Sequence, residues 1–215
     1  DQIVNITGTD NSDAITLVLS ASSLATTVGS SPSVSVGSGA AGVVVDGGSG
    51  ADTFTLSGGD GPELVIRGGD VPAHDILVIQ GGGAADDILS LATGNDTESG
   101  TASLKLAGAG SSTDVPFEGI NAITFEGVGG NNALSVIGSG AGETISLSDV
   151  VGDAGVVRVG SGPVVNYLSL GAGSVSLVGG AGSDDVAIDS RPVDDAWTYT
   201  ATGPRSATPT PMSSG

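Results

Sequence analysis

The 215-residue sequence contains no cysteine, one histidine and one tryptophan, and only 3% of its residues are aromatic. Without cysteine there can be no disulfide framework, no thiolate metal site and no cysteine nucleophile. No apolar run reaches the roughly 18 residues of a membrane helix, so membrane insertion is not expected. With so few aromatics, the core must be built mainly from Val, Ile, Leu and Ala, which suits thin, repetitive packing.

Basic residues are scarce as well. Five Lys and Arg residues stand against 24 acidic residues, and the formal net charge is −19. Such a negative field makes nucleic acid and anionic membrane surfaces poor partners. The basic residues are also scattered, so they form no convincing cleft for an acidic polysaccharide. We expect a solvated acidic surface, or one that divalent cations neutralise.

Glycine is abundant, with 38 residues, and the stretch 47–56 shows how it is used. The three glycines in 47–50 suit a tight chain reversal that packs close to neighbouring backbone. Asp52 closes the corner, where its short carboxylate can accept backbone N–H groups or hold a cation. Phe54 and Leu56 then point to one side and the threonines between them to the other, as in a half-buried strand.

The same register recurs along the chain: a glycine, an acid or amide five positions later, and apolar residues two and four positions after that. It is found at six further corners, one of them stretched by two residues: Gly8/Asp13, Gly68/Asp75, Gly82/Asp87, Gly127/Asn132, Gly138/Glu143 and Gly179/Asp184. Apolar positions repeat every 11 residues at Ile123, Leu134, Ile145 and Val156, and again at Val175, Val186 and Trp197. Such a unit accommodates a strand of about five residues and a turn of about six, too short for a crossover helix.

The sequence therefore predicts an all-β fold: a parallel β-solenoid (β-helix or β-roll) with about 11 residues per strand and turn and about 22 or 33 per coil. The solenoid domain is expected to span residues 1–200, with a Pro/Ser/Thr-rich tail or linker at 201–215. Segment 21–41, with a weak strand at 34–36, is interpreted as an irregular loop or a diverged repeat, and 93–100 as a surface loop. Trp197 and Tyr199 are expected to cover the last coil; the alternative is a platform on which sugars stack.

Two stretches, 47–55 and 179–187, match the pattern GGxGxDxUx, in which U is a large apolar residue, at every specified position. They resemble the nonapeptide of haemolysin-type calcium-binding (RTX) repeats, found in secreted bacterial proteins. The resemblance implies a parallel β-roll whose turns hold calcium through aspartate and backbone carbonyl oxygens. It implies Asp52 and Asp184 as calcium ligands.

The looser copies of the corner extend this implied ligand set to Asp13 and Asp87. The residues themselves leave two interpretations open, structural turns closed by aspartate or calcium sites. A calcium ion takes about six to eight oxygen ligands, and one aspartate per coil supplies few of them.

Catalytic groups are sparse, and the chain is not expected to be an enzyme. His74 lies in an inserted corner, and no G-x-S-x-G nucleophile motif accompanies it. Adjacent acids such as Asp86/Asp87 and Asp184/Asp185 would point to opposite faces of a strand, whereas glycoside hydrolysis needs two carboxylates facing one cleft.

These features predict a secreted or cell-surface structural module of an adhesin, surface layer or extracellular filament. Unpaired strands at the two ends could join copies end to end. The alternatives are an RTX-like calcium-binding folding module of a larger exported protein and a carbohydrate-active β-helix enzyme. The expected partners are calcium ions, further copies of the chain and a cell-surface polysaccharide. The expected location is extracellular or at the cell surface.

Overall fold

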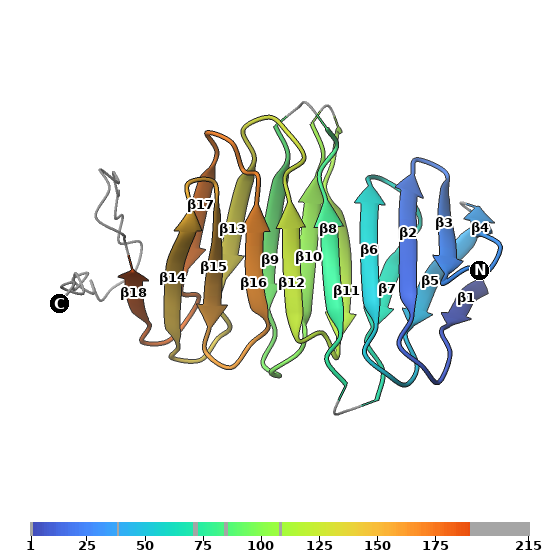
Figure 1. Cartoon of the computed structure of the whole chain (residues 1–215), viewed down its shortest axis with the longest axis horizontal. Coiled ribbons are helices and arrows are strands. Elements are labelled where there is room, and N and C mark those ends of the chain that lie inside the picture. Colours follow the sequence, from blue (N-terminus) through green and yellow to red (C-terminus); the bar gives the residue numbers. More distant parts are fainter. Residues whose placement is uncertain (1, 38, 71–72, 84–85, 108, 190–215) are drawn as a thin grey trace.

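The computed structural model describes residues 2–189, except 38, 71–72, 84–85 and 108 (Figure 1). These residues form 18 strands in two sheets and no helix, so the all-β prediction is confirmed. In this part of the chain there is accordingly no helix that could cross a membrane. The predicted domain boundary at residue 200 and the predicted role of Trp197 and Tyr199 lie outside the described residues.

The two sheets contain eight and ten strands, and neighbouring strands are often far apart in sequence. From one edge to the other, sheet A consists of β1 (Gln2–Thr7), β5 (Ala40–Asp46), β7 (Leu64–Arg67), β11 (Thr113–Glu118), β10 (Gly100–Lys105), β9 (Ile88–Thr93), β13 (Ala133–Ile137) and β17 (Ser174–Val178). Sheet B consists, in the same manner, of β18 (Asp185–Asp189), β14 (Thr144–Val151), β15 (Ala154–Val159), β16 (Val164–Leu168), β12 (Ala122–Glu126), β8 (Ile76–Gln80), β6 (Thr53–Gly58), β2 (Ala14–Ser20), β3 (Ser23–Val28) and β4 (Val34–Gly37).

The chain crosses repeatedly between the sheets. From β5 to β9 it changes sheet at every strand, and the neighbours that this winding creates, such as β5 with β7 and β6 with β8, pair in parallel. Turns that lead from sheet A to sheet B lie along the lower edge of Figure 1, and those that lead back lie along the upper edge. Corners of similar sequence are thereby brought side by side.

Pairing is not parallel throughout, however. Three antiparallel excursions, β2–β3–β4, β9–β10–β11 and β14–β15–β16, make both sheets mixed. They also lengthen the repeat. Hydrogen-bonded corner residues are 23 positions apart at Asp52/Asp75, close to the expected 22, but 39 apart at Asp13/Asp52 and 46 apart at Asp75/Asn121. The expectation of evenly sized, wholly parallel coils is therefore wrong.

The weak strand expected at 34–36 is confirmed as β4. The irregular-loop alternative for 21–41 is wrong, because this segment also contains β3. Its small and polar residues give a weak alternation, but pairing with β2 holds β3 in place, and Leu24 is completely buried. Residues 94–99 connect β9 to β10 as the predicted loop.

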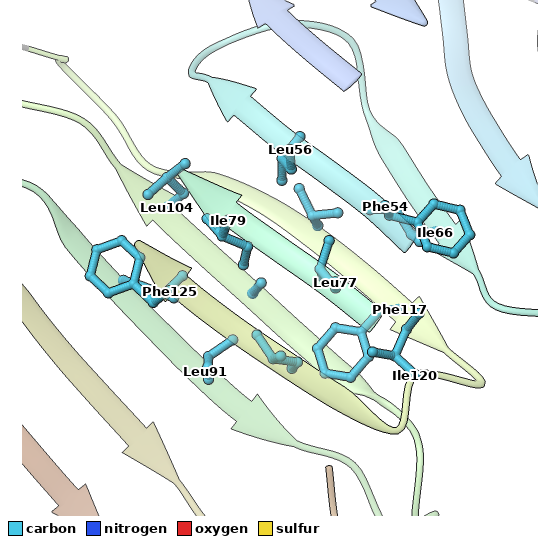
Figure 2. Packing of buried hydrophobic residues seen from close by; sticks show 14 of the residues in the cluster. Phe54, Leu56, Ile66, Leu77, Ile79, Leu91, Leu104, Phe117, Ile120 and Phe125 are labelled. Atoms are coloured by element: carbon cyan, nitrogen blue, oxygen red, sulfur yellow. The ribbon is translucent and has the colours of Figure 1, made fainter. Parts of the chain in front are cut away.

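The core lies between the sheets and is filled from both sides (Figure 2). Phe54 and Phe125 reach it from sheet B and Phe117 from sheet A, each at most 2% exposed. The 11-residue spacing correctly predicts inward positions at Ile123, Leu134 and Ile145. It fails at Val156, which pairs with Ser148 on the outer face of sheet B while Val157 is buried.

Candidate functional site

The predicted corners gather in two rows. We call the turns that lead from sheet A to sheet B the lower turn row; they are 8–13, 47–52, 68–75, 119–121, 138–143 and 179–184. The upper turn row leads from sheet B to sheet A and includes 81–87, 127–132 and 169–173. In both rows, the acidic or amide residue of each predicted corner stands directly before the first residue of the next strand.

A series of hydrogen bonds connects successive turns of the lower turn row. The backbone N of Asp13 donates to Asp52 Oδ1 at 2.7 Å, and the backbone N of Asp52 donates to Asp75 Oδ1 at 2.7 Å. The backbone N of Asp75 in turn donates to Asn121 Oδ1 at 2.8 Å. Each side chain thus fixes the position of the preceding turn in the row.

The same bond recurs at other turns. The backbone N of Asp87 donates to Asn132 Oδ1 at 2.9 Å in the upper row, and that of Glu143 donates to Asp184 Oδ1 at 3.0 Å in the lower row. The residues predicted to close corners therefore act as links between turns that are far apart in sequence.

The four predicted calcium ligands do not form one cluster. Asp13 and Asp52 are neighbours in the lower row, Asp184 lies near the other end of that row, and Asp87 lies in the upper row. Asp13 Oδ2 accepts from the Thr9 backbone N at 2.6 Å, and the two oxygens of Asp87 accept from the backbone N atoms of Gly82 and Ala107. Among the described residues, no three His, Cys, Asp or Glu side chains form a metal-binding group. Calcium binding at these corners stays a prediction.

Asp52 has the least usual environment. Its side chain is completely buried, and its Oδ2 atom has no hydrogen-bond partner. The backbone N of Gly48, which could have served it, donates instead to Asp46 Oδ1 at 3.0 Å. Burial raises the pKa of Asp52 above its ordinary value of 3.8; the bond from the Asp13 amide opposes this, and the nearby carboxylates of Asp75, Asp13 and Asp46 add to it.

Asn132 shows how an amide is bonded at this position. Its Nδ2 donates to Gly127 O at 2.8 Å and to Gly129 O at 2.7 Å, and it also reaches Ser169 O in the neighbouring turn. A Cβ added to Gly127 would collide with Asn132 Nδ2 and Ser169 O.

Asp52 occupies the matching place in its own turn, because a Cβ added to Gly47 would collide with Asp52 Oδ2 and Gly68 O. A carboxylate oxygen of Asp52 therefore lies on the same side of its turn as Gly68 O, where Asn132 places an amide N–H₂ group in its own turn. Protonation of Oδ2 would supply the missing donor.

An acidic groove of about 440 Å³ runs beside the lower turn row. The ends of four adjacent strands of sheet A contribute Thr7, Asp46, Arg67 and Glu118, in register. Arg67 Nε lies 3.5 Å from Glu118 Oε2, and both side chains are about half exposed or more. Solvent screening at this exposure weakens the pair, so the groove is a hydrated, mainly acidic surface.

His74 is exposed, as expected of a loop histidine, while its neighbour Asp75 is buried. Burial raises the pKa of Asp75; the bond from the Asp52 amide opposes this, Glu98 raises it further and His74 lowers it. Of the adjacent acids, Asp86 accepts from the Asn131 backbone N at 2.7 Å and Asp87 is buried. These acids are engaged in holding turns.

Sequence reasoning missed Asn121, which ends the Asp13–Asp52–Asp75 series. Its Nδ2 donates to Glu98 Oε1 at 2.6 Å, and Glu98 O accepts from the Ile120 backbone N at 3.0 Å. The turn is too short to hold the glycine-to-acid spacing. The signal available was an amide residue directly before the alternating strand 122–126.

The chain matches no protein-family model, no curated protein and no solved structure.

Proposed function

We propose that this chain is a structural β-solenoid module of a secreted or cell-surface protein, in which antiparallel hairpins are inserted between the coils. The observation that carries the proposal is the series of turn-to-turn hydrogen bonds from Asp13 through Asp52 and Asp75 to Asn121. Such bonds join successive turns into one edge, so the polar residues of the corners serve the architecture.

The core supports the same interpretation. Inward residues such as Leu56, Leu77 and Ile123 are at most 1% exposed, and they come from neighbouring strands of one sheet. Each coil buries its apolar side against the next, which is how stacked repeats gain stability. An elongated body that needs no disulfide suits the spacing or anchoring of other parts on a cell surface.

The location is tested by immunogold labelling of intact and sectioned cells of the organism that carries the gene. We expect label outside the cell or on its surface. Label confined to the cell interior would contradict the proposal.

Calcium is a separate question within this proposal. Because the corner carboxylates already accept backbone N–H groups, we expect the purified chain to keep its β circular dichroism signal in EDTA. Melting temperatures in EDTA and in calcium, with magnesium as the matched control ion, measure any added stabilisation. A chain that folds only with calcium would favour the RTX-like folding module instead.

A further inference from the structure

The two ends of sheet A are formed by β1 and β17. Among the described strands, β1 pairs only with β5 and β17 only with β13, so each has one unpaired side. Both strands run in the same direction, because β1, β5, β7 and β11 are parallel and the two antiparallel steps through β10 restore that direction for β9, β13 and β17. A translated copy could therefore continue the sheet.

The two sides of each strand differ in which residues direct their backbone N–H and C=O groups toward them. In β5 the inward residue Val43 donates its backbone N toward the following strand, to Glu63 O at 2.8 Å. At the start of β17 the outward residue Ser174 donates toward the preceding strand, to Asn132 O at 3.1 Å. Amides of successive strand residues alternate in direction. Inward residues therefore bond toward the next coil and outward residues toward the previous one.

The same alternation of backbone groups holds at the free edges of β1 and β17. In β17 the backbone groups of the inward residues Val175 and Leu177 face the unpaired side. In β1, where Gly8 donates to Asp46 O at 2.7 Å, the alternation turns the groups of Ile3 and Asn5 away from β5. One end of sheet A thus presents half of a coil-to-coil junction, and the opposite end presents the other half.

We propose that the partner of these edges is a second copy of this chain, whose β1 adds in parallel to β17. The inference deepens the proposed structural role and rests on it. In one register that the free backbone groups allow, Val175 bonds to the residues on either side of Val4 of the second copy. That register places Val4 beside Val175 and Ile6 beside Leu177, apolar against apolar.

Burial and charge at the two edges favour this occupant. Val4, Ile6, Val175 and Leu177 are only partly buried, whereas their interior neighbours in β5 and β13 are at most 1% exposed. Neither edge strand contains a charged residue or a proline, although the chain carries a net charge of −19. Charged residues and prolines are the usual means by which edge strands are kept from pairing. Within the two edge strands, the joint would cover apolar surface without bringing like charges together.

The test uses the full chain with proline at either edge. Asn5→Pro and Val175→Pro each remove an amide that makes no bond to the described residues of its own copy. Asn5→Ala and Val175→Ala are the matched controls that keep the amide. Sedimentation velocity over a concentration series measures assembly, and circular dichroism melting shows that each variant is folded.

We expect the unaltered chain and both alanine variants to form larger linear species as concentration rises, and each proline variant to stay monomeric. A mixture of the two proline variants should form dimers that grow no further, because each supplies one intact edge. Monomers of the unaltered chain at every concentration, or assembly of Asn5→Pro like the unaltered chain, would overturn the inference. Cell-surface labelling that persists alongside either result would leave the structural role standing.

Discussion

The buried carboxyl of Asp52 and the amide of Asn132 occupy equivalent places in two turns, but only the amide is fully bonded. Asn132 donates to Gly127 O and Gly129 O, whereas Asp52 Oδ2 has no partner. An unpaired buried polar group costs about 1–3 kcal/mol. Asp52 is therefore a place where the folded chain gives up stability at neutral pH.

Asp52→Asn should raise the melting temperature at pH 7, by about 2–4 °C if about 1 kcal/mol is recovered. The raised pKa means that the folded state holds its proton more tightly than the unfolded state, whose value is near 3.8. Stability from this group is fully present below that pH and is lost as pH rises through the folded-state pKa. The gain on substitution should therefore be small near pH 4 and larger at pH 7.

Asp10→Asn is the control, since it removes the same charge from an exposed position in a neighbouring turn. Its effect on the melting temperature at pH 7 should be smaller than that of Asp52→Asn. If Asp52→Asn instead lowers stability at pH 7, the unpaired oxygen has a ligand in solution, and calcium becomes the first candidate to examine.

Gly47 tests the close contact between turns. Its φ is not positive, so the demand for glycine here is one of space: an added Cβ would collide with Asp52 Oδ2 and Gly68 O. Gly47→Ala should cost about 1–3 kcal/mol in chemical denaturation, as overpacking does. Gly140→Ala, where a Cβ meets no atom within 4 Å, should stay within about 0.5 kcal/mol. Equal effects would show that the turns are not held in close contact.

Among the elements, the corner strands could be predicted from sequence, and the antiparallel pairing within the hairpins could not. A glycine, an acid and two apolar positions, as in 47–56, specify a turn and an alternating strand locally. β3 has a weak alternation of its own and is held by pairing with β2. The strand order that brings β11 beside β7 depends on contacts across the chain, which no local pattern reveals.

The same distinction applies to the candidate site. Spacing identified Asp13, Asp52, Asp87 and Asp184 as corner residues, and all four lie in turns. What it could not show is that carboxylates bond to the backbone of a neighbouring turn, because those partners are 39 positions apart at Asp13/Asp52 and 41 at Glu143/Asp184.

Leu24→Ala tests whether the β2–β3–β4 hairpin is an integral part of the fold. Leu24 is completely buried, so truncation should cost about 2–5 kcal/mol in chemical denaturation. Val34→Ala in the same hairpin, at a site 52% exposed, should stay within about 0.5 kcal/mol. A small effect at both sites would mean that the hairpin is detached in solution.

At the scale of the whole molecule, the protection of backbone amides against hydrogen exchange should decrease from the middle of the stack of strands toward its two ends. Residues from β6, β8 and β12 fill a core covered on both sides, whereas Val4 in β1 and Val175 in β17 are only partly buried. Local opening is easier where fewer apolar contacts hold a segment.

Hydrogen exchange read by mass spectrometry should therefore be slowest in β6, β8 and β12 and faster in β1 and β17. Dilute protein is the reference, because stacked copies would protect the edge strands at high concentration. Uniform protection in dilute solution would contradict an end-to-middle gradient.

The three antiparallel excursions each add the same number of strands to their sheet. Each adds two strands before the chain crosses to the opposite sheet, so the direction of the chain at the crossing is restored. A single added strand would reverse this direction. A relative of this protein could therefore gain or lose strands in pairs. An even number of added or removed strands leaves the direction of every later strand, and the position of every later corner in its turn row, unchanged.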